Sequence, residues 1–312
     1  MGKSFEYSML LSIYNSLRDN QEVEIVESSS LPVAQGMYEG LSTEEKECMA
    51  SASNAATRVL LCLEPQLLYR GNNSQLRLSL QEDRVGQAGD VRDVLTIRIS
   101  NSWEIGISCK HNHFAVKHSR LSGVLDFGES WFNTPCSQSY FAEIAPLFSE
   151  LRQLKEQEVL WKDINNKAGR FYIPLLEAFI REMRSLDILY PREIPAKLVE
   201  YLIGRKDFYK VIADVKRRVT QITAFNMRGS LNCHADDNQP QTRVQLLHLP
   251  TRFLDIAFKE NSNNTIQIYC DGGWAFNMRI HNASSKVEPS LKFDISLLSY
   301  PPAIYNHHES WE

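Results

Sequence analysis

The chain has 312 residues, of which 43% are hydrophobic, and its formal net charge is −4. That length can bury the core of one large domain or of two ordinary ones. The acidic balance gives no overall sign of a nucleic-acid partner, so such a partner would have to bind where positive charge is locally concentrated.

The cysteines and the apolar runs restrict the compartment. Six cysteines show no C-x-x-C spacing, and no signal-like apolar segment follows Met1. No run of about 18 apolar residues occurs, which excludes a transmembrane helix and argues against a membrane partner. We expect a soluble, cytoplasmic protein with free thiols.

Helical spacing of apolar residues predicts a first helix over 5–17 that carries Glu6 in its opening turn. A second helix is predicted to begin at Ser42, where STEE has the pattern of a capping box, and to end at Glu64. Further helices are predicted at 140–164, in YIPLLEAFIREMRSL and in IPAKLVEYLIG.

Alternating runs predict a strand in LRLSLQ and then a hairpin in which the polar SNSW joins VLTIRI to EIGISC. The last third is predicted to form an antiparallel sheet of four to six strands, with a hairpin turn at CDGGW, from RRVTQITAFNM, TRVQLLHL, RFLDIAFK, NTIQIYC, WAFNMRIHN and SLKFDISLL. We expect an α/β (α+β) fold divided at 1–204 and 205–312, although one sheet could serve both parts.

The first hairpin carries a carboxylate and a lysine. Centring the turn on Asn101 and Ser102 predicts that Asp93 faces Lys110, about 5 Å apart at Cβ. Such a pair at the end of a strand suits metal-assisted phosphodiester hydrolysis, because a divalent ion held by carboxylate oxygens activates water that the lysine can orient or deprotonate. The alternative is an ordinary surface salt bridge.

A hard Mg²⁺ ion usually needs more than one protein carboxylate. Glu104 is predicted to lie on the same strand face as Lys110, but about 20 Å away along the strand, which is too far. The position two before the lysine, where a second acid would serve best, holds Ser108. The second acid could be Glu6 or Asp90, and we favour Glu6.

These parts resemble the nuclease core of the PD-(D/E)xK superfamily, through GKSFE, GDVRDVLTI and EIGISCK, with Ser108 in place of the usual acid. Over 2–302, the segments GDVRDV, WEIGISCKHNHFAVKHSRLS, DFGESW and RIHNASSKVEPSLKFDISL are similar to the type II restriction endonuclease family named for HaeIII. The resemblance implies a mixed central sheet flanked by helices, with a β-rich C-terminal region for DNA recognition.

The same resemblance implies a Mg²⁺-dependent endonuclease that cuts double-stranded DNA within the palindrome GGCC and leaves blunt ends. It implies a homodimer, and a cognate DNA methyltransferase as a functional rather than physical partner. Asp93 would be a metal ligand, Lys110 the catalytic lysine and Glu6 the helix glutamate that binds metal. Ser108 leaves the number of metal-binding carboxylates open.

Two segments concentrate positive charge. Residues 105–125 contain no acid, and we expect Lys117 and Arg120 to contact phosphates, with His113 contacting DNA or holding the loop. Residues 205–228 contain seven Lys or Arg against two Asp, and they include Arg217 and Arg218. The alternatives are a solvated loop for the first segment, and for the second a solvated helix face followed by a lysine-protected edge strand.

Guanines in the major groove are best read by bidentate arginine. We therefore expect Arg228 and Arg279, in or beside the late strands, and their neighbour Asn282 to read bases; the alternative is that Asn282 caps its own turn. Two other functions compete with the endonuclease. One is a nuclease-fold protein that binds DNA without cutting it, and the other is a non-enzymatic β-rich interaction module.

Overall fold

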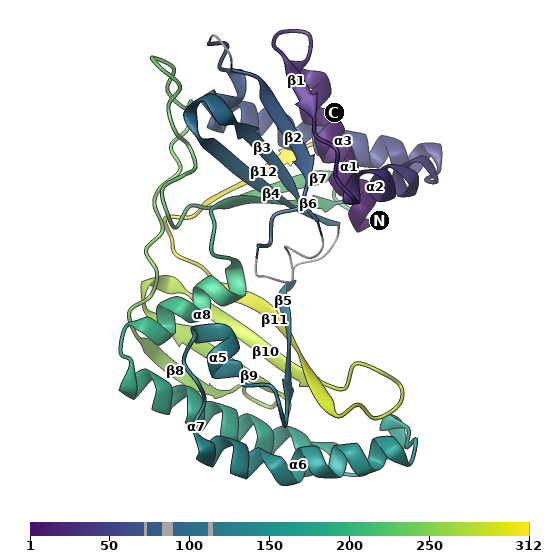
Figure 1. Ribbon diagram of the computed structural model, residues 1–312, viewed down its shortest axis with the longest axis vertical. Coiled ribbons are helices and arrows are strands. Elements are labelled where there is room, and N and C mark those ends of the chain that lie inside the picture. The colour runs from purple at the N-terminus through teal and green to yellow at the C-terminus, as the bar shows by residue number, and fades with distance from the viewer. Residues whose placement is uncertain (72–73, 83–89, 112–114, 312) are drawn as a thin grey trace. The chain divides into compact units, whose positions relative to one another are not determined.

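The computed structural model describes residues 1–71, 74–82, 90–111 and 115–311, without the side chains of 115 and 116 (Figure 1). Two compact units are formed, each from separate segments. Unit 1 comprises Met1–Phe114, Gly204–Leu247 and Ala303–Glu312, and unit 2 comprises Ala115–Ile203 and His248–Pro302. The division into a core and a recognition region at residue 205 stays a prediction.

Unit 1 is built on a seven-stranded mixed sheet in the order β1-β2-β3-β4-β6-β7-β12. β1 pairs with β2, and β4 with β6, in parallel, while the other neighbours are antiparallel. The strands are Val23–Ile25 (β1), Leu76–Leu80 (β2), Val94–Arg98 (β3), Trp103–His111 (β4), Phe208–Asp214 (β6), Val219–Phe225 (β7) and Tyr305–Ser310 (β12).

The helices of unit 1 are α1 (Gly2–Leu17), α2 (Ser30–Glu39) and α3 (Thr43–Leu63), followed by a 3-10 turn at Pro65–Leu68. The predicted capping box is confirmed: the Glu45 amide donates to the Ser42 hydroxyl at 3.2 Å, and the Ser42 amide donates to the Glu45 carboxylate at 2.9 Å. The apolar faces of α1 and α3 share one core with alternate residues of the strands, among them Ile105, Ile107 and Cys109 of β4.

Unit 2 contains a five-stranded antiparallel sheet in the order β5-β11-β10-β9-β8. Its core includes the aromatic rings of Trp131 and Phe179, which pack on each other and on Phe293 of β11. The elements are β5 (Ala115–Ser122), α5 (Phe127–Phe132), α6 (Gln138–Glu156), α7 (Ile173–Leu189), α8 (Glu193–Ile203), β8 (Phe253–Phe258), β9 (Thr265–Cys270), β10 (Ala275–His281) and β11 (Ser290–Ser299), with short turns of helix at Trp161–Asp163, Ala168–Tyr172 and Asp271–Gly273.

The mixed α/β architecture, the first helix and the hairpin of β3 and β4 are confirmed. The CDGGW turn is confirmed as well, between β9 and β10, with φ of 69° at Gly272 and 91° at Gly273. Glycine suits both positions, because a side chain disfavours positive φ.

Several element predictions were wrong. α6 ends at Glu156 rather than near residue 164, because Glu158 adopts a φ of 55° and Leu160 then forms a β-bridge with Lys286. TRVQLLHL is not a strand: its Val244 amide, for example, donates to the Asn232 side chain instead of to a neighbouring strand. β6 was missed, and β7 belongs to the sheet of unit 1 instead of a C-terminal sheet.

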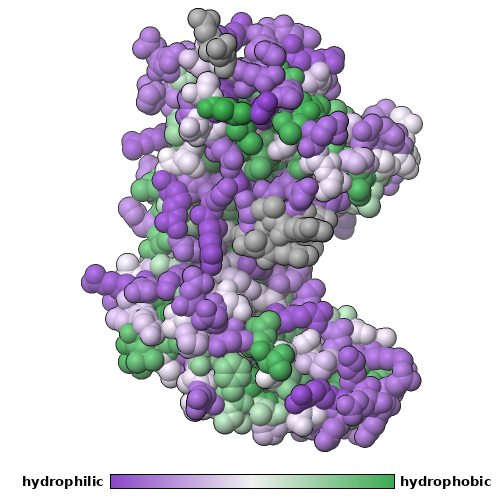
Figure 2. Space-filling view, viewed as in Figure 1, coloured by the Kyte–Doolittle hydropathy of each residue, from purple (hydrophilic) through white to green (hydrophobic). Residues whose placement is uncertain are grey.

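Hydrophilic side chains cover most of the face shown in Figure 2, with hydrophobic residues in small patches between them. None of the helices in the described ranges is long and apolar enough to cross a membrane.

Candidate active site

The hairpin of β3 and β4 has a different register from the one expected. Arg98 pairs with Trp103 and Val94 with Ile107, so paired numbers sum to 201 rather than 203. The reason lies in the turn, where Ile99–Asn101 form a short 3-10 helix and Ser102 adopts a left-handed φ of 55°. Continuing this register brings Asp93 beside Ser108 instead of opposite Lys110.

Lys110 nevertheless reaches Asp93. Asp93 Oδ2 accepts hydrogen bonds from the Cys109 amide at 2.7 Å, Lys110 Nζ at 3.1 Å and the Ser108 hydroxyl at 3.3 Å. The side chains of Lys110 and Asp93 are 31% and 21% exposed, so solvent and a ligand can reach the pair. Within the described ranges, Asp93 Oδ1 accepts no hydrogen bond, which leaves that atom available to a cation.

Glu6 projects from the start of α1 and is buried, with its Oε2 atom 3.1 Å from Lys3 Nζ. Burial raises the pKa of Glu6, the Asp93 carboxylate raises it further, and Lys3 and Lys110 act in the opposite direction. Because Asp93 and Lys110 both influence the Glu6 carboxyl group, this group lies within electrostatic reach of the pair at the end of β4.

The two other acids considered are held by Arg92. Its guanidinium donates to both oxygens of Asp90, at 2.8 and 2.7 Å, and to Glu104 at 2.6 Å. The Arg92 stem crosses Gly106, where an added Cβ would lie 2.1 Å from Arg92 Cδ. Burial acts to raise the pKa values of Asp90 and Glu104, but Arg92 and Lys206 outweigh it and lower both. Arg92 does not hold Glu6, and the role of Glu6 as the second metal-binding acid stays a prediction.

Lys210 is one of the seven positive residues of the basic segment 205–228, but the sequence did not predict it beside the β4 residues of the candidate site. β6 runs parallel to β4, and Lys210 pairs with Ser108. Its neighbours Tyr209 and Val211 point into the core of unit 1, so Lys210 points to the opposite face, as Ser108 does. Burial, assisted by the Lys110 ammonium, lowers the pKa of Lys210 to about 8. The available signal was a single lysine inside the apolar run FYKVIA.

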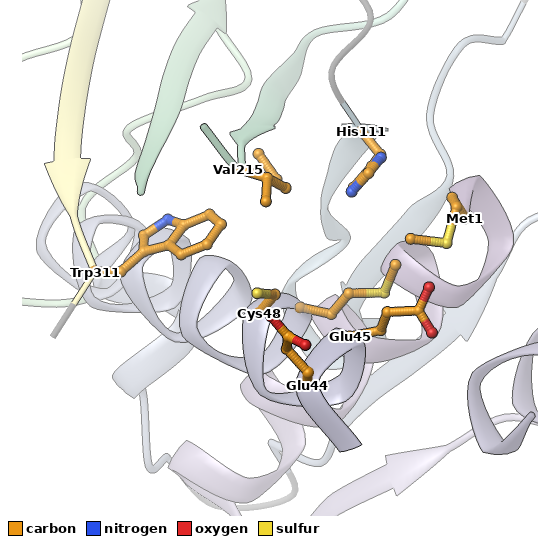
Figure 3. Close-up of a pocket in the computed structure, with 9 residues that line it drawn as sticks. Met1, Glu44, Glu45, Cys48, His111, Val215 and Trp311 are labelled. Carbon is orange, nitrogen blue, oxygen red and sulfur yellow. The ribbon is translucent and has the colours of Figure 1, made fainter. Parts of the chain in front are cut away.

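The last residue of β4, His111, lines a pocket of about 320 Å³ with Trp311 and Cys48 (Figure 3). Burial, with a smaller contribution from the positive N-terminus, lowers the pKa of His111. Glu44 and Glu45 lie at the same pocket, so it does not suit a phosphate.

Three arginines of unit 1 were predicted to contact DNA. Arg217 is 82% exposed and pairs with Asp214 at 3.3 Å, while Arg218 lies over the Trp311 ring at 5.6 Å. Arg228 lines a pocket of about 500 Å³, with Arg205 and Lys206 among the other lining residues. The acids Glu104 and Asp207 line the same pocket and balance part of its positive charge. DNA contact by the three predicted residues stays a prediction.

The other predicted DNA contacts lie in unit 2, except His113, which is outside the described residues. Lys117 donates to the Tyr201 carbonyl at 2.8 Å and lies 3.6 Å from the centroid of its ring. Arg120 pairs with Glu288 at 2.6 Å. Both residues thus have protein partners that a phosphate would have to replace or join.

Arg279 and Asn282 also have partners within unit 2. Arg279 pairs with Asp294 at 2.9 Å and is 56% exposed. Asn282 is buried, and its amide donates to the Ser284 and Lys286 carbonyls at 2.6 and 2.8 Å. The structural alternative, a turn capped by Asn282, therefore describes this residue, and base reading by either residue stays a prediction.

The donor set suits Mg²⁺ bound together with a phosphate. The described residues contain no group of three or more His, Cys, Asp or Glu side chains that could hold a metal by themselves. Mg²⁺ usually keeps several waters and takes one or two carboxylates plus substrate phosphates. Asp93 and Glu6 can provide such carboxylates, with hard oxygen donors and no soft ligand.

Comparison with known proteins gives the family. The family model described as HaeIII restriction endonuclease matches residues 2–301. Type II restriction enzyme HaeIII of Haemophilus aegyptius is 40% identical over 311 residues, which cover 100% of this chain and 97% of that protein. The chain belongs to the HaeIII restriction endonuclease family. No solved structure matches it.

The resemblance inferred from the sequence motifs is thereby confirmed. As a full-length homologue of a type II restriction enzyme, this HaeIII-family protein is a site-specific deoxyribonuclease. Membership of the family excludes the non-enzymatic interaction module, in which Asp93 and Lys110 would form only a salt bridge.

Proposed function

We propose that this HaeIII-family enzyme hydrolyses phosphodiester bonds of duplex DNA within GGCC, with Mg²⁺ and as a homodimer. The observation that carries the proposal is the contact of Lys110 with Asp93 at 3.1 Å, with Glu6 in electrostatic reach, in a chain related to HaeIII over its whole length. The target sequence is the one implied by the family resemblance.

Asp93 and Glu6 would hold the Mg²⁺ ion, which supplies an activated water and stabilises charge that develops on the phosphate. Asp93 is positioned for this by the Cys109 amide and the Ser108 hydroxyl, which leave Oδ1 uncommitted. Lys110, beside the same carboxylate, orients the attacking water and faces the phosphate with a positive charge. Hydrolysis joins the water oxygen to phosphorus and breaks the bond to the leaving oxygen, which takes up a proton.

The homodimer follows from the symmetry of the proposed target. A palindrome is two-fold symmetric, and two identical chains related by a two-fold axis present the same contacts to both half-sites. A cutter of this kind endangers the DNA of its own host, so a methyltransferase of the same specificity is the expected functional partner. The free thiols of all six cysteines suit the reducing cytoplasm in which we place the enzyme.

Cleavage of defined DNA tests the proposal. Purified protein is incubated with a plasmid that contains GGCC sites, with Mg²⁺ and separately with EDTA, and the ends are sequenced. Discrete, blunt, Mg²⁺-dependent fragments that end within GGCC are expected, and the same plasmid with methylated GGCC sites should stay intact. A gel shift without any cutting would favour a DNA-binding protein that has lost catalysis, and ends at other sequences would contradict the proposed specificity.

A further inference from the structure

Lys210 lies in the proposed active site through the pairing of two strands. The register of β4 and β6 aligns Ser108 with Lys210, and paired residues on neighbouring strands lie about 5 Å apart. Ser108 and Lys110 of β4 both donate hydrogen bonds to the Asp93 carboxylate. Lys110 lies two residues after Ser108, on the same face of β4, and its ammonium acts electrostatically on Lys210.

Among the described residues, no acid forms an ion pair with the Lys210 ammonium. Within the part of the chain that the structure describes, Lys210 makes no hydrogen bond or ion pair, and Asp93 is engaged by Lys110. A half-buried ammonium without a counter-charge nearby is costly, and the neighbouring Lys110 adds repulsion. An anion at this point would offset both the cost of burying the ammonium and the repulsion from Lys110. In a DNA-cutting enzyme that anion is a phosphate.

We propose that the Lys210 ammonium donates a hydrogen bond to a non-bridging oxygen of the scissile phosphate, as a second catalytic lysine beside Lys110. The inference rests on the proposed function, because it takes the end of β4 as the place where DNA is cut. Lys210 keeps its protons throughout and stabilises charge that grows on the phosphate oxygens. The pKa of about 8 leaves the group mostly protonated at neutral pH, and a bound phosphate would raise that pKa again.

This role explains why a serine suits position 108. A carboxylate there would stand opposite Lys210 and neutralise it in a cross-strand ion pair. The Ser108 hydroxyl donates to Asp93 instead and leaves the ammonium to the substrate. Lys210 thus supplies positive charge beside position 108, where the superfamily pattern has an acid.

The test compares Lys210→Met and Lys210→Gln with Lys210→Arg, wild type, Lys110→Ala and the exposed-lysine control Lys155→Met. Single-turnover cleavage of a duplex with one GGCC site is measured with Mg²⁺, and binding of that duplex is measured in EDTA over a range of NaCl concentrations. Far-UV circular dichroism melts check folding. Removal of one donor to a developing oxyanion typically slows a reaction about 10²- to 10³-fold, so the two neutral variants should cut at least about 100-fold more slowly.

The salt dependence separates phosphate contact from a structural role. A plot of log K against log [NaCl] has a negative slope, and each phosphate contact that is lost makes this slope shallower by about 0.9. We expect that shallower slope in Lys210→Met and Lys210→Gln, a wild-type slope in Lys210→Arg, and wild-type behaviour of Lys155→Met. If either folded neutral variant cuts within threefold of wild type, or binds with an unchanged slope, the inference is overturned while the proposed function stands. A wild-type protein that does not cut overturns both.

Ser108→Asp provides a second test, because the proposal and its simplest alternative predict opposite changes in the cleavage rate. If Ser108 only lacks a useful metal ligand, the new acid should speed cleavage. If Lys210 binds the phosphate, the new acid should pair with it, and Ser108→Asp should slow cleavage more in the wild-type background than in Lys210→Met. Faster cutting by Ser108→Asp than by wild type would therefore count against Lys210.

Discussion

Asp93 is held by two neighbours of the same hairpin, the Cys109 amide and the Lys110 ammonium. The carboxylate thus has a fixed orientation before any cation or DNA arrives, and its second oxygen remains available. Pre-orientation of this kind avoids a rearrangement when the metal and the phosphate bind. The hydroxyl of Ser108 contributes to the same hold, which gives this residue a positioning role.

Asp93→Ala and Lys110→Ala should each abolish cleavage, with a rate loss of at least about 10³-fold, because charge stabilisation and positioning supply most of the rate. Site binding in EDTA should be largely preserved. Glu104→Gln is the control, since the amide oxygen can still accept from Arg92 and Glu104 pairs with Arg92 and Lys206 rather than with Lys110. Cleavage by either alanine variant at the wild-type rate, or a large loss in Glu104→Gln, would show that the active site is misplaced.

At the scale of the elements, β3 and β4 are tied together by Arg92 as well as by their ladder. Arg92 is 4% exposed, passes over Gly106 and is fixed at its far end by Asp90 and Glu104. A glycine is therefore required at position 106 by the close approach of a side chain that cannot move away without losing several charge-assisted hydrogen bonds.

Gly106→Ala should destabilise the protein by about 1–3 kcal/mol, because the new methyl group overlaps a buried side chain. The free energy of unfolding is measured by urea denaturation. Gly36→Ala in α2 is the matched control, because nothing lies within 4 Å of its added Cβ, and alanine in a helix should stabilise by about 0.5–1 kcal/mol. Equal midpoints for Gly106→Ala and wild type would contradict the packing described here.

A buried acid joins α3 to β6. Glu64 follows α3, and its Oε1 atom accepts hydrogen bonds from the Tyr209 hydroxyl and the backbone N–H of Asn232, each at 2.6 Å. Burial, which outweighs these two bonds, raises the pKa of Glu64 from 4.5 to about 7. Between these values the folded protein binds a proton that the unfolded chain lacks, so this contribution to stability is complete below pH 4.5 and is lost as the pH rises through 7.

Glu64→Gln should therefore be less sensitive to pH than wild type. From pH 5 to pH 8, wild type should lose up to about 3 kcal/mol of unfolding free energy relative to the glutamine variant, which cannot ionise. Urea denaturation of both proteins across this range measures the difference. A constant difference would show that Glu64 does not change its protonation in that window.

For the whole molecule, the proposed palindromic target sets the stoichiometry. Sedimentation analysis in EDTA should find two chains on a 20-bp duplex with one GGCC site. A duplex of the same composition with GCGC in place of GGCC is the control, and it should bind at least about 10³-fold more weakly, as non-specific DNA generally does. One chain per GGCC duplex would contradict the homodimer, whatever the affinity.

Much of the fold of each unit could be read from local patterns. Helices with a cap or a clear apolar period, such as α3, and the glycine turn between β9 and β10 follow from local backbone chemistry. β6 could not be found in this way, because it lies inside the sheet and its one lysine, Lys210, resembles a lysine of a solvated surface. The end of α6 was predicted wrongly because the helix ends at a turn in which Glu158 adopts a positive φ, and a glutamate does not indicate such a turn in the sequence.

The sequence alone was enough to predict the family, the pairing of Asp93 with Lys110 and a glutamate on the first helix, because each depends on residues close together in the chain or on long matching motifs. Three features depend on how distant segments fold together: the hairpin register, the attachment of Asp90 and Glu104 to Arg92, and the place of Lys210. Neither strand alone specifies which strand it pairs with or in which register, because both depend on contacts between segments far apart in the sequence. β4 and β6 are separated by about a hundred residues, and their parallel register brings Lys210 beside Ser108.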